Sequence, residues 1–192
     1  NNTSYGVRSQ GVEAEAALSP ARNFRITAGV TYTDASYRSD LVGNRSGAPL
    51  DPALRVLPGS NLSNAPQVVV TTSWAWTPEI GNDGIHGLLY IDGRLTSDYN
   101  TGSDLFPQKG QDGFFVANAR IGLRGPEEKW AIEFWVQNLF DKNYAQVAFN
   151  SPFQAGTTAA PVVDPQYPGG RQIFSQFLAE PRTLGATIRT RF

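Results

Sequence analysis

The sequence contains no cysteine and no methionine, and His86 is its only histidine. Without cysteine there can be no disulfide, thiolate metal site or cysteine nucleophile, and one histidine excludes a metal site built from several. Charged residues make up only 17% of the chain, below the roughly 25% of soluble domains, and the formal net charge is −1. This balance gives no electrostatic case for nucleic acid as a partner. No apolar run approaches the about 20 residues that a transmembrane helix needs.

Alternation of apolar and polar residues, the pattern of a half-buried strand, runs through most of the chain. The alternating stretches are rich in Val, Ile, Thr and aromatic residues, which favour strands, and many exceed the usual length of about five or six residues. We predict strands at 5–18, 24–37, 67–77, 87–98, 114–124, 129–143 and 182–192. The fold class is therefore all-β, and we expect an antiparallel meander in sequence order.

The connections between these strands alternate between short and long. The segments 19–23 and 125–129 are tight, and 77–87 is of middling length. The long loops are expected at 38–66, 99–113 and 144–181. A soluble sandwich has no reason to sort its loops in this way, whereas a membrane β-barrel has short periplasmic turns and long extracellular loops.

Each predicted strand has one uncharged face. This apolar face consists of every second residue of 12–18, 24–32, 68–76, 89–95, 115–123, 130–136 and 184–192. The interleaved residues form the polar face, and its charged members are Glu13, Glu15, Arg25, Asp92, Arg94, Arg120, Glu133, Arg189 and Arg191. The apolar face would be the core of a soluble sandwich or the lipid-facing surface of a barrel, so the faces alone do not separate these folds.

Aromatic residues gather at both ends of the predicted strands. Those toward the short turns are Phe24, Trp74, Trp76, Trp130 and Phe192. Those toward the long loops are Tyr32, Tyr37, Tyr99, Phe114, Phe115 and Tyr144. Two such rings are typical of the interfacial girdles of a membrane barrel, and core aromatics at the ends of a sandwich are the alternative.

The odd number of predicted strands indicates whether the chain could form a whole barrel. If the short turns are periplasmic, an odd number of strands places residue 1 on the extracellular side and Phe192 on the periplasmic side. Bacterial single-chain barrels have an even number of strands, and open edges are not tolerated in lipid. We therefore expect the chain to be the C-terminal part of a larger barrel, which agrees with the absence of an initiating methionine.

Three motifs carry a resemblance to a known family. The segment Val136–Tyr144 reads VQNLFDKNY, the segment Glu180–Phe192 reads EPRTLGATIRTRF, and Leu62–Pro66 reads LSNAP. Together they resemble the C-terminal part of TonB-dependent outer-membrane receptors, in strand order over essentially the whole chain. Independently of this resemblance, the alternation of apolar and polar residues is interrupted at Asn138–Leu139, which predicts a bulge or a bend in the strand.

The resemblance implies about seven C-terminal strands of a 22-stranded transmembrane barrel in the outer membrane, with an N-terminal plug and a TonB-binding segment that this chain lacks. The implied partners are TonB, a scarce solute such as a ferric siderophore, outer-membrane lipid and the barrel assembly machinery. The barrel is expected to be monomeric, completed by the rest of its own chain. A C-terminal aromatic such as Phe192 resembles the signal that the assembly machinery reads, and it can also be a girdle residue.

The solute site is expected at the long-loop end of the barrel. By position alone, the candidates are Asp98, Asn118 and Arg182 near the outer rim, Trp135 on the polar face, and Tyr167 and Arg171 in the longest loop. No catalytic residue, metal site or cofactor is expected, because His86 lies in a predicted turn without a readable partner. A passive porin-like barrel and a soluble β-sandwich binding module remain the alternatives to a transporter.

Overall fold

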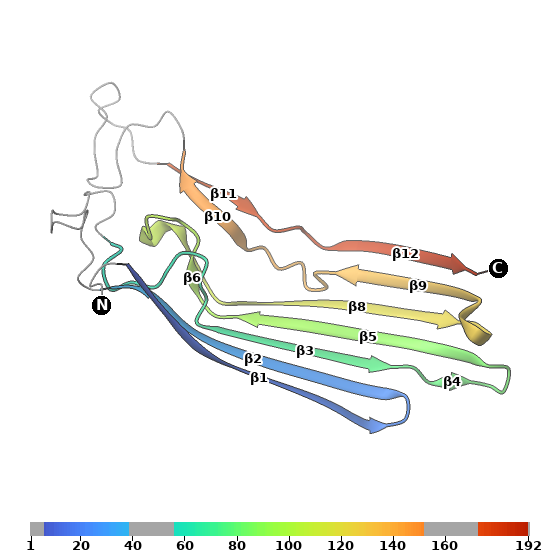
Figure 1. The fold of residues 1–192 in the computed structure, drawn as a ribbon. Helices are drawn as coiled ribbons and strands as arrows, with labels where there is room; N and C mark the ends of the chain where they lie inside the picture. The colour runs from blue at the N-terminus through green and yellow to red at the C-terminus, as the bar shows by residue number, and fades with distance from the viewer. Residues whose placement is uncertain (1–5, 39–55, 152–172, 192) are drawn as a thin grey trace.

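The computed structural model describes residues 6–38, 56–151 and 173–191, and its main element is one antiparallel sheet of eight strands (Figure 1). The long strands follow one another in the order β1-β2-β3-β5-β8-β9-β12, and β4 pairs with β5 at the side of this path. Their bounds are β1 Val7–Ala21, β2 Phe24–Tyr37, β3 Val68–Trp76, β4 Glu79–Ile80, β5 Ile85–Thr96, β8 Phe114–Arg124, β9 Trp130–Gln137 and β12 Thr183–Thr190. The antiparallel meander predicted from the sequence is confirmed.

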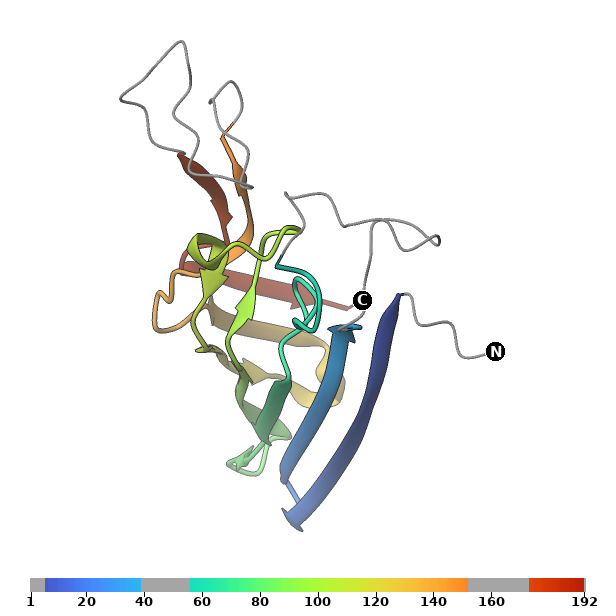
Figure 2. The same cartoon turned by 90° about the vertical axis from the view of Figure 1, so that its left-hand side faces the viewer.

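The sheet curves across its strands, so that β1 and β12 are the two edges of an open trough (Figure 2). Within the described residues neither edge is paired with a further strand. The short turns gather at one end of the trough, and the strand ends that lead into the long connections lie at the other (Figure 1). The predicted sorting of the loops is therefore confirmed.

The apolar face lies on the convex side of the sheet and is exposed. Its most exposed large side chains include Val12 at 70%, Leu18 at 63%, Ile121 at 61%, Leu184 at 73% and Ile188 at 74%. A sandwich would cover this face with a second sheet, but the other sheets among the described residues are two small two-stranded ones. An exposed apolar surface of this extent is what a membrane-spanning barrel presents to lipid.

In the part of the chain that the structure describes, no helix is long and apolar enough to cross a membrane.

The connection between β3 and β5 differs from the expectation. Residues 77–87 were predicted to be a turn, but Glu79–Ile80 forms β4 and pairs with the start of β5. His86 therefore lies within β5, between Glu79 and Arg124 of the neighbouring strands, and the prediction of a turn histidine is wrong. The reversal is made instead by two glycines with positive φ, which have no Cβ to oppose that conformation.

Two of the predicted long loops contain secondary structure. The segment 99–113 includes β6 (Tyr99–Asn100), the 3₁₀ helix η2 (Pro107–Lys109) and β7 (Gly110–Gln111). In the segment 144–181, β10 (Ala145–Asn150) pairs with β11 (Phe174–Leu178). Another short helix, η3 (Pro126–Glu128), makes the tight turn between β8 and β9.

The two outer hairpins, β6–β7 and β10–β11, pack against each other. The rings of Phe106 and Phe174 are stacked at 6.5 Å. The Lys109 ammonium lies 5.7 Å from the centre of the Phe174 ring and is held by both carboxylate oxygens of Asp104, at 2.7 and 2.8 Å. The backbone N–H of Ala148 donates to the carbonyl of Thr101. The outer end of this part of the sheet is thus a packed structure rather than a set of independent loops.

Candidate functional site

The NLFDKNY motif ends β9 and fixes the direction of the chain beyond it. Asn138 has φ of 50°, so the strand stops at Gln137 rather than at 143. The Asn138 side-chain N–H₂ donates to the carbonyls of Lys142 and Glu180 at 3.0 and 3.2 Å, and the backbone N–H of Lys142 donates back to Asn138 Oδ1 at 2.8 Å. The predicted bend is confirmed, and it ties the end of β9 to the segment that leads into β12.

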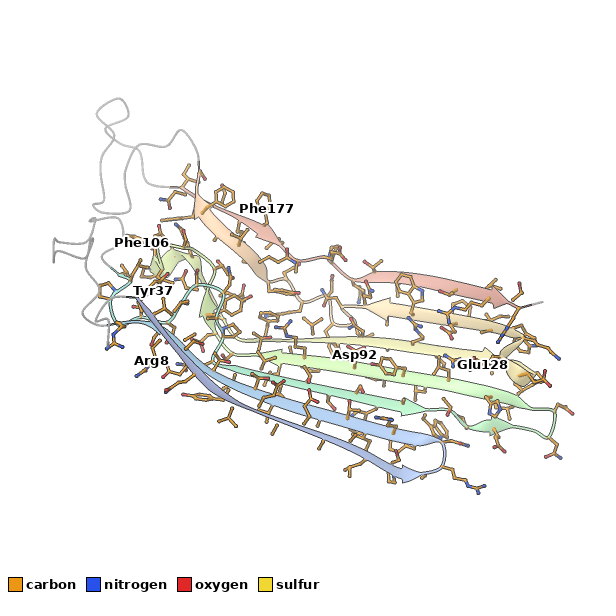
Figure 3. All side chains as sticks on the ribbon, viewed as in Figure 1. Arg8, Tyr37, Asp92, Phe106, Glu128 and Phe177 are labelled. Carbon is orange, nitrogen blue, oxygen red and sulfur yellow. The ribbon has the colours of Figure 1, made fainter. Side chains whose placement is uncertain are left out.

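Asn118 joins this bend to the middle of the sheet. The strand register places Asn118 on β8 directly opposite Asp92 on β5. Asn118 Nδ2 donates to Asp92 Oδ2 at 2.8 Å, and Asn118 Oδ1 accepts the backbone N–H of Asn138 at 3.0 Å. Asp92 lies near the middle of the strands, between Phe106 at the long-loop end and Glu128 at the short-turn end (Figure 3). The Asp92–Asn118 pair therefore fixes two polar side chains near the middle of the strands, on the concave face of the sheet. Two hollows on this face, described next, both include these two residues in their linings.

The upper hollow, nearest the long loops, has a volume of about 320 Å³. Its lining is a mixture of aromatic, charged and neutral polar residues, and its members are Asn64, Pro66, Asp92, Arg94, Thr96, Tyr99, Phe114, Val116, Asn118 and Tyr144. The Thr96 hydroxyl is buried, with the residue 2% exposed, and it has no hydrogen-bond partner within the described residues. A buried hydroxyl without a partner is unfavourable by about 1–3 kcal/mol unless a bound molecule satisfies it.

Three aromatic rings form one wall of the upper hollow. Phe114 stacks on Tyr144 with centroids 4.1 Å apart, and Tyr99 lies 6.3 Å from Phe114. The Tyr99 hydroxyl donates to the carbonyl of Ala145 at 3.4 Å. Burial raises the pKa of the Tyr99 phenol, Tyr144 raises it further and Arg94 opposes the shift. Tyr99 therefore stays protonated at neutral pH and keeps a hydrogen to donate.

The girdle interpretation of these three rings is wrong. Tyr99, Phe114 and Tyr144 lie on the concave side, and Phe114 is only 8% exposed. Phe115, the next residue along the strand, points to the convex side and is 41% exposed. Because successive side chains of a strand point to opposite faces, Phe114 and Phe115 cannot share one belt.

The lower hollow continues the upper one toward the short turns and has a volume of about 370 Å³. Its lining is Tyr90, Asp92, Asn118, Ala119, Arg120, Trp135, Val136 and Gln137, so the two hollows share Asp92 and Asn118. The indole N–H of Trp135 donates to Thr187 Oγ1 at 3.2 Å, and its ring lies over Gly185, where a Cβ would collide with it. Gly185 therefore leaves the space that Trp135 occupies.

An ion cluster lies below the lower hollow. Glu133 is fully buried, and its carboxylate accepts from Arg120 at 3.1 Å and from Arg124 at 3.1 and 3.3 Å. Gly122 stands opposite Glu133 on β8, and a Cβ there would be 2.9 Å from Glu133 Cγ. The cluster has no nucleophile, and no group of three His, Asp or Glu side chains is placed to hold a metal ion within the described residues.

The structure brings two of the six predicted solute residues together. Asn118 lines both hollows and Trp135 lines the lower one. Asp98 and Arg182 are exposed and line neither, and the backbone N–H of Arg182 donates to Asp141 Oδ1 at 2.9 Å. Tyr167, Arg171 and Phe192 lie outside the described residues. A solute role for all six, and the assembly role of Phe192, stay predictions.

Several lining residues were not among the candidates, notably Asp92, Arg94, Thr96, Tyr99, Phe114 and Tyr144. The signal that could have found most of them is the strand phase. Arg94 and Thr96 share the phase of Asp92 on β5, and Phe114 shares the phase of Asn118 on β8. Tyr144 carried no such signal, because it lies beyond the bend at Asn138.

Comparisons with known proteins give a consistent result. A family model described as TonB dependent receptor-like, beta-barrel matches residues 1–139. A search of curated protein sequences finds no match. Among solved structures, the ferric yersiniabactin uptake receptor FyuA from Yersinia pestis aligns with a TM-score of 0.69 and 16% identity, over 97% of this chain and 24% of that one.

Two structures from Acinetobacter baumannii are also similar. The ferric preacinetobactin receptor BauA has a TM-score of 0.61 and 15% identity, over 95% of this chain and 22% of that one. The siderophore receptor PiuA has a TM-score of 0.58 and 15% identity, over the same shares. The chain thus spans about a quarter of the length of the structures that it matches, and likeness at these identities shows the fold.

Proposed function

The chain belongs to the TonB dependent receptor-like β-barrel family, and on that premise we propose that it forms part of the wall of an outer-membrane receptor that imports a scarce solute. The observation that carries this proposal is the pair of connected hollows on the concave face. The upper hollow lies nearest the long loops, and its lining combines aromatic rings, one acid, one base and neutral polar groups. Concave sites with a few oriented polar groups are typical of small-molecule recognition.

The solute class that fits this lining best is a ferric siderophore or a similar chelate. Such molecules combine apolar or aromatic faces with many oxygen atoms, and the upper hollow offers the stacked rings of Phe114 and Tyr144 beside the Arg94 guanidinium. Arg94 can attract the negative charge of a chelate, and the Thr96 hydroxyl can bond to one of its oxygens. FyuA is a ferric yersiniabactin uptake receptor, BauA a ferric preacinetobactin receptor and PiuA a siderophore receptor, and the likeness of the fold supports the same solute class.

The remaining parts of the account follow from the family and are proposals of the same kind. An N-terminal plug would fill the trough, a segment before it would engage TonB, and further strands would close the barrel between β12 and β1. The complete barrel would be a monomer surrounded by outer-membrane lipid. The assembly machinery would read the aromatic residue at position 192.

A transport experiment in living cells tests this function. The full-length receptor is expressed in a Gram-negative strain that lacks its own siderophore receptors, and uptake of ⁵⁵Fe from a panel of ferric siderophores is measured with and without TonB. We expect accumulation of iron from at least one chelate, and we expect that accumulation to be lost in the strain without TonB.

Two outcomes would contradict the proposal in different ways. Iron uptake that continues without TonB would indicate a passive pore instead. If no ferric chelate is taken up although heat-modifiable gel mobility shows folded receptor in the outer membrane, the siderophore assignment is wrong and the solute belongs to another class.

A further inference from the structure

A third hollow, with an apolar lining, lies on the convex side of the sheet, away from the polar site. Its volume is about 440 Å³, and it is found at the short-turn half of β3, β5, β8 and β9. Six of its residues belong to the exposed apolar face, namely Trp76, Leu89, Ile121, Leu123, Ile132 and Phe134. No charged or hydroxyl-bearing side chain lines it, so it cannot recognise the solute that the concave hollows are suited to.

The groove is formed where the β4 segment rises beside β5. Pro78 and Ile80 make one wall, and Trp76 continues that wall at the end of β3. Gly87 leaves the floor open, because a Cβ at that position would lie 3.1 Å from Pro78 Cγ and 3.4 Å from Ile80 Cδ1. The hollow is therefore built into the β3–β4–β5 connection.

The position of the groove along the strands indicates which part of the membrane surrounds it. Trp76 and Trp130 lie at the short-turn ends of their strands, and tryptophan favours the membrane interface. Along β9, Phe134 lies four residues beyond Trp130, which is about 14 Å for an extended strand. The groove thus runs from the interface into the hydrocarbon layer, and it is continuous with the lipid-facing surface.

We propose that this groove is a binding site for a phospholipid acyl chain of the periplasmic leaflet. An acyl chain is wholly apolar and flexible enough to follow a curved cleft. A peptide segment would need partners for its backbone N–H and C=O groups, and apart from the Trp76 indole the lining side chains supply none. This proposal does not depend on the solute or on TonB, so it can be tested separately from the proposed function.

Photo-crosslinking measures occupancy of the groove directly. The full-length receptor is reconstituted in vesicles of phosphatidylethanolamine and phosphatidylglycerol that contain a phospholipid with a diazirine on its acyl chain, and labelled peptides are mapped by mass spectrometry. Ile188 is the internal reference, because the register sets it level with Ile132 and Leu123 although it is outside the groove. We expect about tenfold more label in the groove, the ratio that burying roughly two further methylene groups would produce.

Matched variants separate a built site from general lipid contact. Leu123→Trp fills the groove and should reduce labelling of the groove peptides to the level at Ile188, whereas Ile188→Trp should leave that labelling unchanged. Ile80→Ser, which removes part of the wall, is a second route to the same loss if Leu123→Trp does not fold. Equal labelling of the groove and of Ile188 in the wild-type receptor would overturn the proposal.

Discussion

Glu133 and Arg120 form an ion pair of 3.1 Å on the concave face, although Glu133 is completely buried and the Arg120 side chain is 40% exposed. Arg124, 29% exposed, contributes a second pair to the same carboxylate. Breaking the pair therefore has different consequences for the arginines and for Glu133, because only the arginines are accessible to water. An arginine left alone can turn to water, but a carboxylate left alone stays in the interior.

This difference predicts unequal effects of the two kinds of substitution. The double variant Arg120→Met, Arg124→Met leaves Glu133 buried without a cation and should lower the free energy of unfolding by about 3–5 kcal/mol. Glu133→Gln leaves two partly exposed arginines and a neutral amide, and should lower it by about 1–3 kcal/mol. Guanidinium unfolding of the full-length receptor in detergent measures both. Equal losses would contradict the burial of Glu133.

The two faces of β1 offer a matched test of the membrane orientation. Ala16 and Ala17 are adjacent exposed alanines, but Ala16 belongs to the apolar face and Ala17 to the polar face. In a bilayer, Ala16→Arg should lower stability by about 2–4 kcal/mol, and Ala17→Arg should have a much smaller effect. Unfolding of the two variants in lipid vesicles gives the comparison. Similar losses for both would count against lipid on the convex side.

The bend at Asn138 predicts a substitution series at one position. Asn138→Ala loses the hydrogen bonds to Lys142 and Glu180 and also places alanine at positive φ, so it should be destabilising by about 2–4 kcal/mol. Asn138→Gly keeps the conformation and loses only the bonds, and its loss should be about 1–3 kcal/mol. Thermal unfolding of the three proteins checks this order. A glycine variant as unstable as the alanine variant would remove the backbone part of the explanation.

The packing of the outer hairpins predicts that they open together. Asp104→Asn leaves Lys109, whose side chain is 4% exposed, without its carboxylate, and should therefore loosen both β6–β7 and β10–β11. Hydrogen exchange followed by mass spectrometry should show faster exchange in both hairpins and unchanged exchange in β5 and β8. The control is Glu127→Gln, which removes a pair exposed by 65% and 77% and should change neither hairpin. Faster exchange in β6–β7 alone would refute the coupling.

Much of the main sheet could be predicted because the patterns that specify it lie within single strands and the turns between them. An apolar residue at every second position fixes the two faces, and the sorted turns fix the order of the strands. The bend in NLFDKNY could be predicted because the alternation fails there, at Asn138. The strand phase placed Trp135 on the polar face, and it lines the lower hollow. Asn118 was expected near the outer rim, but it lies opposite Asp92, near the middle of the strands.

The outer hairpins could not be predicted, because their contacts join segments far apart in the sequence. Lys109 looks like a surface residue until Asp104 and Phe174 are seen to enclose it. The aromatic wall was missed for a different reason. Position at a strand end suggested a girdle for Phe114 and Tyr144, but the phase of Phe114 and the turn before Tyr144 direct both rings inward.

The most direct test of the central claim is the affinity of the purified full-length receptor for a ferric siderophore, measured with Thr96→Val and Arg94→Gln. Thr96→Val removes a hydroxyl that has no partner in the described structure, so stability should be unchanged or higher, while affinity should fall about three- to tenfold. Arg94→Gln should weaken binding further, and Arg189→Gln, at the far end of the concave face, should leave it unchanged. A wild-type receptor that binds no ferric siderophore, or four proteins with the same Kd, would contradict the account.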